Sequence, residues 1–220
     1  MNFATRWNRI RYTAWAAAYD LVVGFSKQRR RAIELLALEP GERVLIVGAG
    51  TGSDLPFLRA DVDVLATDLT LAMLKRARPK AGPRVELRQM DGQELALPDA
   101  MFDAVILHLI LAVIPDPVAC LREAARVVRP GGRISVLDKF VEPGARPGWL
   151  RRLANLPLRI IDTDINRVLE RILEESGAPR EIEHAEPAGF PFRIALLRKR
   201  GGPAASRQQL EEPKTGVANG

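Results

Sequence analysis

The segment VLIVGAGTG, residues 44–52, constrains the fold of this chain more than any other part of the sequence. A short apolar run enters a turn in which every second residue is glycine, and glycine allows sharp turns and close approach of a ligand to the backbone. Asp68 follows about twenty residues after the first glycine. A carboxylate at this position can accept hydrogen bonds from both hydroxyls of an adenosine ribose. The combination of apolar run, glycine turn and distant acid predicts a nucleotide-binding site.

The spacing of the glycines indicates which class of nucleotide fits this turn. Dinucleotide-binding turns follow the pattern G-x-G-x-x-G, which would require glycine at position 53, where this chain has Ser53. The spacing here is G-x-G-x-G, which suits a ligand without a pyrophosphate at the following helix N-terminus. A dehydrogenase is therefore disfavoured. The alternative for residues 48–52 is a simple turn without a ligand.

Apolar runs alternate with amphipathic segments from residue 43 onward, and this alternation predicts an α/β fold. The runs are nearly continuous, as expected for strands with helices on both faces of a sheet. The expected strands are residues 43–47, 62–67, 84–88, 103–111 and 133–138, and the expected helices lie near 53–59, 70–77 and 117–128. This order indicates a doubly wound, mostly parallel, Rossmann-like sheet with right-handed crossovers.

Turn and cap signals mark the ends of one helix clearly. Asp116-Pro117 supplies an N-cap followed by proline at the first helical position. The sequence Arg-Pro-Gly-Gly at 129–132 then ends the helix and turns the chain into the next strand.

The flanking segments extend this core on both sides. Residues 3–37 carry apolar side chains at spacings of three and four, which predicts N-terminal helices that cap the substrate site or meet a membrane. The expected parts are N-terminal helices in 1–40, a main domain in 41–200, a helical insert at 139–179 with helices around 148–161 and 164–175, an antiparallel strand pair at 180–184 and 192–200, and a disordered tail at 201–220.

Composition limits the cellular setting more than the chemistry. No apolar run reaches the roughly 18 residues that span a bilayer, and the N-terminus lacks the apolar core of a signal peptide. The single cysteine, Cys120, cannot form an intramolecular disulfide, and no set of metal-ligand residues clusters near it. We therefore expect a cytoplasmic protein without a metal site, with Cys120 packed in the core.

Positive charge is concentrated near the N-terminus. The net charge of the chain is +6, and residues 1–31 carry seven Lys or Arg residues against one acid, Asp20. This asymmetry indicates an anionic partner surface, either a membrane or a nucleic acid. The alternative is a basic face that meets only solvent.

Further motifs follow the glycine turn in a fixed order. They are Asp91-Gly92 after the third expected strand, Phe102-Asp103 at the start of the fourth, and RVVRPGGRI, residues 126–134, before the fifth. Over roughly residues 40–140 the chain therefore resembles the class I S-adenosylmethionine-dependent methyltransferases. The resemblance implies the methyltransferase form of the Rossmann-like fold, methyl-transfer activity and S-adenosyl-L-methionine as cofactor.

The resemblance also implies roles for individual residues. The glycine turn would line the methionine part of the cofactor, Asp68 would hold the ribose, Leu69 would pack on the adenine and Asp91 would accept from its amino group. The residues implied in cofactor binding are Gly48, Ala49, Gly50, Thr51, Gly52, Asp68, Leu69, Asp91, Gly92, Gln93, His108 and Leu109.

One position departs from the family pattern. Many members have an acid two residues before the first glycine, where this chain has Ile46, so weak affinity or a modified pose is an open alternative.

Methyl transfer from a sulfonium requires alignment and exclusion of water more than side-chain chemistry, and such positioning can lower a barrier by roughly 7–11 kcal/mol. An amine acceptor must still lose a proton, and a phenol or carbon acceptor needs a base. The candidate catalytic residues are Tyr19, His108 and Asp138. Each has a structural alternative: a helix-packing aromatic, a hydrogen-bonded core histidine and a loop cap, respectively.

Two methyltransferase groups share features with the N-terminal segment. TAWAAAYDLVVGF, residues 13–25 with the pair Tyr19-Asp20, resembles the first helix of the bacterial phosphatidylethanolamine N-methyltransferases and of the ubiquinone/menaquinone biosynthesis enzymes. HLILAVIPDP (108–117) and LDKF (137–140) resemble the phospholipid group more closely. Tryptophans beside arginines near the N-terminus and in the insert are typical of helices that lie in a membrane interface.

The leading hypothesis is therefore N-methylation of a phospholipid amine head group, such as phosphatidylethanolamine, at an anionic membrane surface on its cytoplasmic side. A quinone or another small amphipathic acceptor is the nearest alternative. A nucleic-acid acceptor is disfavoured because the arginines are not interleaved with stacking aromatics. From another class, a non-catalytic S-adenosylmethionine-binding module stays open because of Ile46 and the lack of an evident catalytic dyad. No obligate protein partner is indicated.

Overall fold

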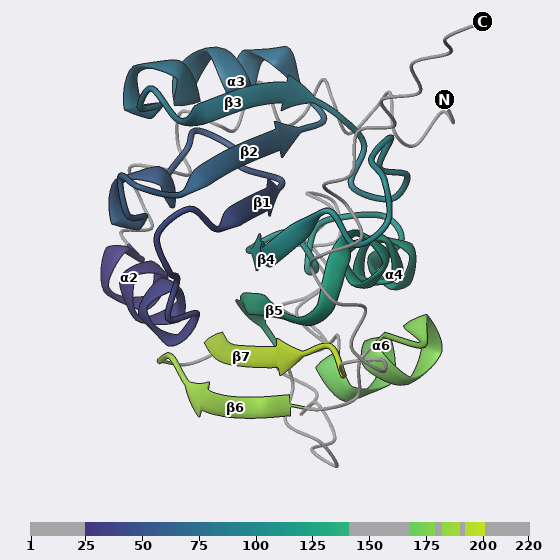
Figure 1. Cartoon of the computed structure of the whole chain (residues 1–220). Coiled ribbons are helices and arrows are strands. Elements are labelled where there is room, and N and C mark those ends of the chain that lie inside the picture. The colour runs from purple at the N-terminus through teal and green to yellow at the C-terminus, as the bar shows by residue number, and fades with distance from the viewer. Residues whose placement is uncertain (1–24, 141–167, 179–181, 190–191, 201–220) are drawn as a thin grey trace, which may run out of the picture.

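The computed structural model describes residues 25–140, 168–178, 182–189 and 192–200. Within these residues, seven strands form one sheet in the order β3-β2-β1-β4-β5-β7-β6 (Figure 1). The strands are β1 (Arg43–Val47), β2 (Asp63–Asp68), β3 (Val85–Gln89), β4 (Phe102–His108), β5 (Val128–Lys139), β6 (Ile182–Pro187) and β7 (Phe192–Arg198). The pairs among β1–β5 are parallel, whereas β7 runs antiparallel to β5 and β6 antiparallel to β7. The predicted doubly wound sheet with a terminal antiparallel pair is confirmed.

Helices cover both faces of this sheet. They are α2 (Ser26–Leu35), α3 (Leu71–Ala77), α4 (Pro117–Val127) and α6 (Leu169–Ser176), with 3-10 turns η1 (Leu55–Phe57) and η2 (Arg78–Lys80). Figure 1 shows α4 and α6 together on one side and α2 on the other, beside β1, β5 and β7. Among the described residues, no helix is long and apolar enough to cross a membrane.

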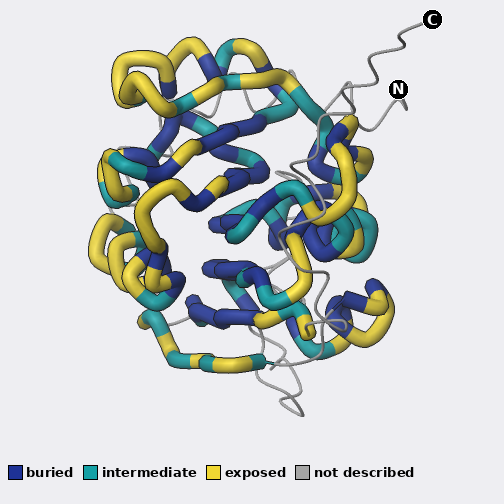
Figure 2. Tube along the Cα trace, in the orientation of Figure 1, coloured by how far each residue is buried: buried dark blue, intermediate teal, exposed yellow. Residues whose placement is uncertain are grey.

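The alternating side chains of the strands build an apolar core on each face. Val105, Leu107 and Val136 pack with α4 and α6 on one face, whereas Ile46 and Ile106 pack with the α2 side on the other. Figure 2 shows the central strands as the most deeply buried part of the chain. Cys120 of α4 is fully buried in the first of these clusters, as expected of a packing residue. The burial of both sheet faces explains why the strands read as nearly continuous apolar runs.

The ends of α4 follow the predicted signals. The Asp116 side chain accepts a hydrogen bond from the backbone N–H of Ala119 at 2.8 Å, and Pro117 is the first helical residue. At the other end, Lys199 Nζ donates to the backbone oxygens of Ala125 and Val128 at 2.6 and 2.8 Å. Because the last carbonyls of a helix lack intrahelical partners, this lysine stabilises the helix end.

Two sequence predictions near the glycine turn are wrong. A helix over 53–59 does not form; the structure has only the three-residue turn η1, which contains Pro56, and the chain is extended again at Leu58. Proline is tolerated in this first turn, and the helix ends because Leu58 takes an extended backbone conformation, with ψ of 151°. The strand expected at 103–111 ends at His108 because Leu109 takes a left-handed backbone conformation, with φ of 60°.

Other boundaries also differ. β2 and β3 lie one residue later than expected, β6 ends three residues later and β7 ends two residues earlier. β5 begins at Val128, five residues earlier than expected, because the turn that contains Gly131 continues into the strand. The helix expected around 164–175 is described only as α6, and that expected over 3–37 only as α2. The helix expected around 148–161, the tail at 201–220 and most of the insert lie outside the described residues.

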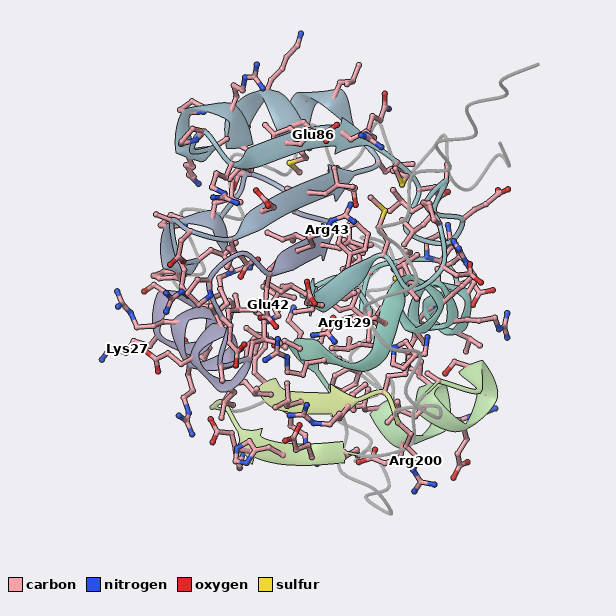
Figure 3. All side chains as sticks on the ribbon, viewed as in Figure 1. Lys27, Glu42, Arg43, Glu86, Arg129 and Arg200 are labelled. Carbon is pink, nitrogen blue, oxygen red and sulfur yellow. The ribbon has the colours of Figure 1, made fainter. Side chains whose placement is uncertain are left out.

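A group of ion pairs closes the amino ends of the central strands. Figure 3 shows Glu42, Arg43 and Arg129 near the middle of the molecule, whereas Lys27, Glu86 and Arg200 lie at its periphery. The Glu42 carboxylate pairs with Arg133, and Arg129 pairs with Asp103. Asp103 also accepts from the backbone N–H of Arg43 at 2.7 Å. These contacts join β1, β4 and β5 at the edge opposite the glycine turn.

Candidate active site

The candidate site lies where the order of the parallel strands reverses. β1 pairs with β2 on one side and with β4 on the other, so the connections from these strands leave in opposite directions. In open α/β sheets such a reversal leaves a crevice at the carboxyl ends of the strands. The glycine turn after β1, Asp68 at the end of β2 and His108 at the end of β4 all meet at this edge.

The glycine turn owes its shape to three left-handed residues. Gly48, Gly50 and Gly52 have φ angles of 70°, 56° and 75°, which residues with a Cβ rarely adopt. The backbone N–H of Ala49 donates to Thr67 of β2 at 2.8 Å, and that of Gly52 donates back to Ala49 at 2.9 Å. The turn therefore folds over the end of β2, with its backbone tied to the strand.

The surroundings of the three glycines differ. A Cβ at Gly48 would lie 2.6 Å from the Ile110 side chain, and one at Gly52 would lie 2.9 Å from Leu55. A Cβ at Gly50 would meet no atom of the described residues within 4 Å. The backbone at Gly50 therefore faces open space, and a ligand could approach it closely there.

Asp68 connects this turn to the end of β2. One carboxylate oxygen accepts from the backbone N–H of Gly50 at 2.9 Å, and the other accepts from the N–H and hydroxyl of Thr70 at 2.9 and 3.0 Å. Burial raises the pKa of Asp68, and the hydrogen bonds from Thr70 and Gly50 partly offset it. A carboxylate offers about four acceptor positions, so a half-buried Asp68 can still receive a ligand hydroxyl. Leu69, also half-buried, follows at the same edge.

Asp91, Gly92 and Gln93 form a second turn near this edge. Asp91 accepts from the backbone N–H and the side-chain amide of Gln93 at 2.9 and 3.0 Å. The Gln93 side-chain oxygen in turn accepts from the N–H of Asp116 at 2.9 Å. A Cβ at Gly92 would lie 2.7 Å from Val47, so this turn packs directly against the end of β1.

His108 is buried in a network that begins and ends on α2. Its Nδ1 lies 2.7 Å from Asp54 Oδ1, and its Nε2 lies 3.0 Å from the Ser135 hydroxyl. Arg29 of α2 pairs with the other Asp54 oxygen at 2.5 Å, and Ser135 donates to the backbone oxygen of Ala32 at 3.2 Å. Burial would raise the pKa of Asp54, but His108 and Arg29 outweigh it and lower this pKa to about 2.

The segment after β4 is held by the end of β5. Leu109, in its left-handed conformation, donates its backbone N–H to Leu137 at 2.7 Å. Asp138 is buried, and its carboxylate accepts from the backbone N–H groups of Ala112 and Lys139 at 2.9 and 2.8 Å. Non-glycine residues in this conformation are uncommon and tend to mark functional sites.

An apolar cluster with a lysine beside it lies at the same edge, beside β5 and β7. The rings of Phe25 and Phe192 are 4.2 Å apart, and Leu109 packs in the same cluster. Lys139 Nζ lies 5.7 Å from the centre of the Phe192 ring. Burial lowers the pKa of Lys139, and the neighbouring Asp138 partly offsets this effect.

Comparison with known proteins agrees with this arrangement. A family model described as a methyltransferase domain matches residues 45–136. The phosphatidylethanolamine N-methyltransferase of Cereibacter sphaeroides is 40% identical over 135 residues, which are 59% of this chain and 66% of that protein. The demethylmenaquinone methyltransferase of Tropheryma whipplei (strain Twist) is 35% identical over 163 residues, 68% of this chain and 67% of that protein. The chain spans between half and two thirds of the length of the first curated relatives.

A solved structure extends the likeness to the fold. A putative methyltransferase from Bacillus halodurans C-125 is 25% identical with a TM-score of 0.64, and the match covers 73% of this chain and 71% of that one. The chain belongs to the S-adenosylmethionine-dependent methyltransferases. The cofactor of this family is S-adenosyl-L-methionine. The matched region runs from β1 to β5, whereas α2, α6, β6 and β7 lie outside it.

The methyltransferase fold brings most of the expected site residues to one edge. The glycine turn contacts Asp68 directly, and the turn that contains Asp91 packs on β1 beside it. Their roles toward the cofactor stay predictions, as do the catalytic roles of His108 and Asp138, whose described contacts are with the protein itself. Tyr19 lies outside the described residues. Within the described part of the chain, no group of three or more His, Cys, Asp or Glu side chains could hold a metal ion.

Sequence reasoning missed Asp54, Arg29 and Ser135 as parts of the site. Asp54 follows the last glycine by two residues, and this proximity was the only available signal. Its partners are 25 and 54 residues away along the chain. No local pattern marks such a set, because its members come from four different elements.

Replacement of Gly50 by alanine tests whether the open space over the turn holds the cofactor. Gly50→Ala adds a Cβ there and should weaken binding of S-adenosylhomocysteine about tenfold or more in calorimetry. The matched control is Gly41→Ala, since Gly41 also has a positive φ, of 76°, and no neighbour within 4 Å, but precedes β1 at the opposite edge. Both variants should lose roughly 1–2 kcal/mol of stability. Equal cofactor affinity in the two variants would contradict this placement.

The electrostatics of Asp54 predict a pH-dependent contribution to stability. Its folded-state pKa of about 2 lies below the ordinary value of 3.8, so the ionised carboxylate stabilises the fold above pH 4 and loses this effect as the pH falls toward 2. By linkage the contribution is about 2 kcal/mol. The difference in unfolding free energy between wild type and Asp54→Asn, from urea titrations, should therefore be largest above pH 4 and shrink below it. A difference that stays constant from pH 6 to 2.5 would show that this charge does not contribute.

Proposed function

We propose that this methyltransferase transfers the methyl group of S-adenosyl-L-methionine to the amine of a phospholipid head group, such as phosphatidylethanolamine, at an anionic membrane surface. The observation that carries the proposal is an apolar cluster with a lysine beside it at the carboxyl ends of β4 and β5, where Phe25 and Leu109 are half-buried against Phe192 and Lys139 lies near the Phe192 ring. This cluster adjoins the glycine turn, since Leu109 precedes Ile110, which packs on Gly48.

The residues at the glycine turn fit the cofactor of the family. Gly50 leaves open space beside a turn of backbone amides, and Asp68 at its rim retains acceptor capacity for a ribose hydroxyl. Leu69 would contact the adenine and Asp91 its amino group. When bound, the cofactor supplies an activated methyl group on a sulfonium. The chain then has to align the acceptor with it and exclude water.

The acceptor side of the site has the chemistry of an amphiphile with an anionic head group. The half-buried side chains of Phe25 and Leu109 offer apolar contact to the lipid, and the half-buried Lys139, which lies near the Phe192 ring, offers a positive charge to its phosphate. An ion pair in such partly buried surroundings is stronger than one at an open surface. The amine nitrogen loses its proton before or during attack; of the three candidates, Tyr19 and Asp138 are the ones proposed to receive it, because both ring nitrogens of His108 contact protein groups.

Sequence similarity supports an amphipathic acceptor but names two kinds. The 40% identical relative is a phosphatidylethanolamine N-methyltransferase, and the 35% identical relative acts on demethylmenaquinone, as its name states. The lysine beside an apolar cluster favours the phosphate-bearing acceptor over the uncharged quinone. The basic N-terminal segment further supports binding at the cytoplasmic face of an anionic membrane.

The test of this function is methyl transfer to defined lipids. The full chain is incubated with methyl-labelled S-adenosylmethionine and vesicles that contain phosphatidylethanolamine with phosphatidylglycerol. Matched vesicles contain phosphatidylcholine in place of phosphatidylethanolamine, and a third sample offers demethylmenaquinone. Label in mono- and dimethylated phosphatidylethanolamine supports the proposal. Label in the quinone alone, or in neither acceptor, overturns it.

Lys139 should determine affinity for the lipid acceptor. Lys139→Gln removes the positive charge, so KM for phosphatidylethanolamine should rise about tenfold while the affinity for S-adenosylhomocysteine stays within twofold of wild type. Lys139→Arg should restore part of the lipid affinity. Lys27→Gln is the matched control, because Lys27 is an exposed lysine of α2, and its KM should not change. An unchanged KM in Lys139→Gln would remove Lys139 from the acceptor site.

A further inference from the structure

The glycine turn lacks the helix that would normally fix its downstream end. η1 contains only Leu55–Phe57, and the chain is extended from Leu58 onward. The backbone N–H groups of Ala49 and Gly50 donate to the Thr67 carbonyl and the Asp68 side chain, which ties the upstream part of the turn to β2. The described backbone hydrogen bonds after Gly52 are local ones, from Leu55 to Gly52, from Phe57 to Asp54 and from Leu58 to Leu55. Contacts with other elements therefore decide where this segment lies relative to the sheet.

The Asp54 side chain supplies such contacts. Its side chain is 3% exposed and that of His108 is 0% exposed. One oxygen meets Arg29 at 2.5 Å and the other meets His108 at 2.7 Å. An ionised carboxylate only accepts hydrogen bonds, so Nδ1 of His108 is the protonated ring nitrogen in this contact. Hydrogen bonds to charged groups are the strong ones, and burial keeps them from solvent.

The far end of the network returns to the same helix. Ser135 of β5 contacts His108 and donates to the backbone oxygen of Ala32. Arg29 and Ala32 are three residues apart on α2, so they lie on one face of this helix. The helix α2 therefore contacts Asp54, two residues after the glycine turn, directly. It contacts His108, the last residue of β4, through Asp54 and Ser135.

The network of Arg29, Asp54, His108 and Ser135 lies near Ile46, the position where many family members have an acid. Ile46 of β1 is paired with Ile106 of β4, and both belong to the apolar cluster on the α2 side. His108 lies two residues beyond Ile106, hence on the same face of β4. The Asp54 carboxylate therefore contacts His108 on the same face of the sheet as Ile46, whose side chain is apolar.

We propose that α2 is part of the cofactor site, although it lies outside the matched methyltransferase domain, and that Arg29 acts through Asp54 and His108 as a positioning residue for the glycine turn. This inference rests on the proposed binding of S-adenosylmethionine at that turn, but not on the identity of the acceptor. Loss of the Arg29 charge leaves Asp54 buried with one partner, and the chain after Gly52 is then free to move.

The test compares two arginines of the same helix. Arg29→Gln in the full chain should weaken the affinity for S-adenosylhomocysteine about tenfold or more in calorimetry, and Arg29→Lys should recover part of it. Arg31→Gln is the matched control: Arg31 pairs with Glu186, and its side chain is 49% exposed. Its affinity should stay within twofold of wild type. Equal affinities for Arg29→Gln and Arg31→Gln would overturn the proposal.

A second comparison separates positioning from general destabilisation. Ile172→Val in α6 removes one methylene group from the core on the opposite face and lowers the melting temperature without touching the network. At a temperature where both variants are folded, only Arg29→Gln should show a weakened affinity for S-adenosylhomocysteine. Equal losses of affinity in both variants would assign Arg29 a purely structural role.

The outcomes for this inference and for the proposed function remain distinguishable. Wild-type binding of S-adenosylhomocysteine with methyl transfer to another acceptor would overturn the phospholipid assignment and leave the role of Arg29 supported by its variants. Wild-type binding that Arg29→Gln does not weaken would overturn the role of Arg29 alone. No binding by the wild type would overturn both.

Discussion

The reversal of strand order between β1 and β4 is the constraint on which the candidate site depends. Because both strands run parallel with both neighbours, their carboxyl ends open toward the same edge, and the following turns diverge there. The hydrogen bond from Gly50 to Asp68 then ties the turn after β1 to the end of β2. The ion pairs around Glu42 and Asp103 hold the opposite edge closed. The sheet therefore has one edge stabilised by ion pairs and one edge available for a ligand.

Much of this arrangement could be predicted because it depends on short-range patterns. Strands buried on both faces leave continuous apolar runs. Asp116-Pro117 gives a local cap signal, and the structure shows the expected hydrogen bond from the Ala119 N–H to the Asp116 side chain. The helix expected at 53–59 is cut to the three residues of η1 because Leu58 takes an extended conformation, which no residue type at that position signals. The network of Arg29, Asp54, His108 and Ser135 could not be found in this way. Its contacts join residues 25, 54 and 27 positions apart, and only the folded chain brings them together.

His108 shows how one residue can satisfy two interpretations of a sequence. Its place at the end of β4 suits a catalytic group, yet both ring nitrogens contact Asp54 and Ser135 inside the protein. A buried polar side chain with both nitrogens bonded stabilises the surrounding structure. A general base, by contrast, must reach the proton that it removes. The observed contacts therefore favour a positioning role for His108, which helps to fix the glycine turn relative to α2.

The proposed acceptor and cofactor regions adjoin, and α2 contacts both. The ring of Phe25, at the start of this helix, packs at a tilt of 56° against that of Phe192 beside Lys139, and Arg29, one turn later, pairs with Asp54 after the glycine turn. A shift of α2 on binding of an amphipathic acceptor would change both contacts at once, since a helix of 10 residues moves as a rigid element. Acceptor binding and cofactor affinity should then be coupled, and by thermodynamic linkage the coupling acts equally in both directions.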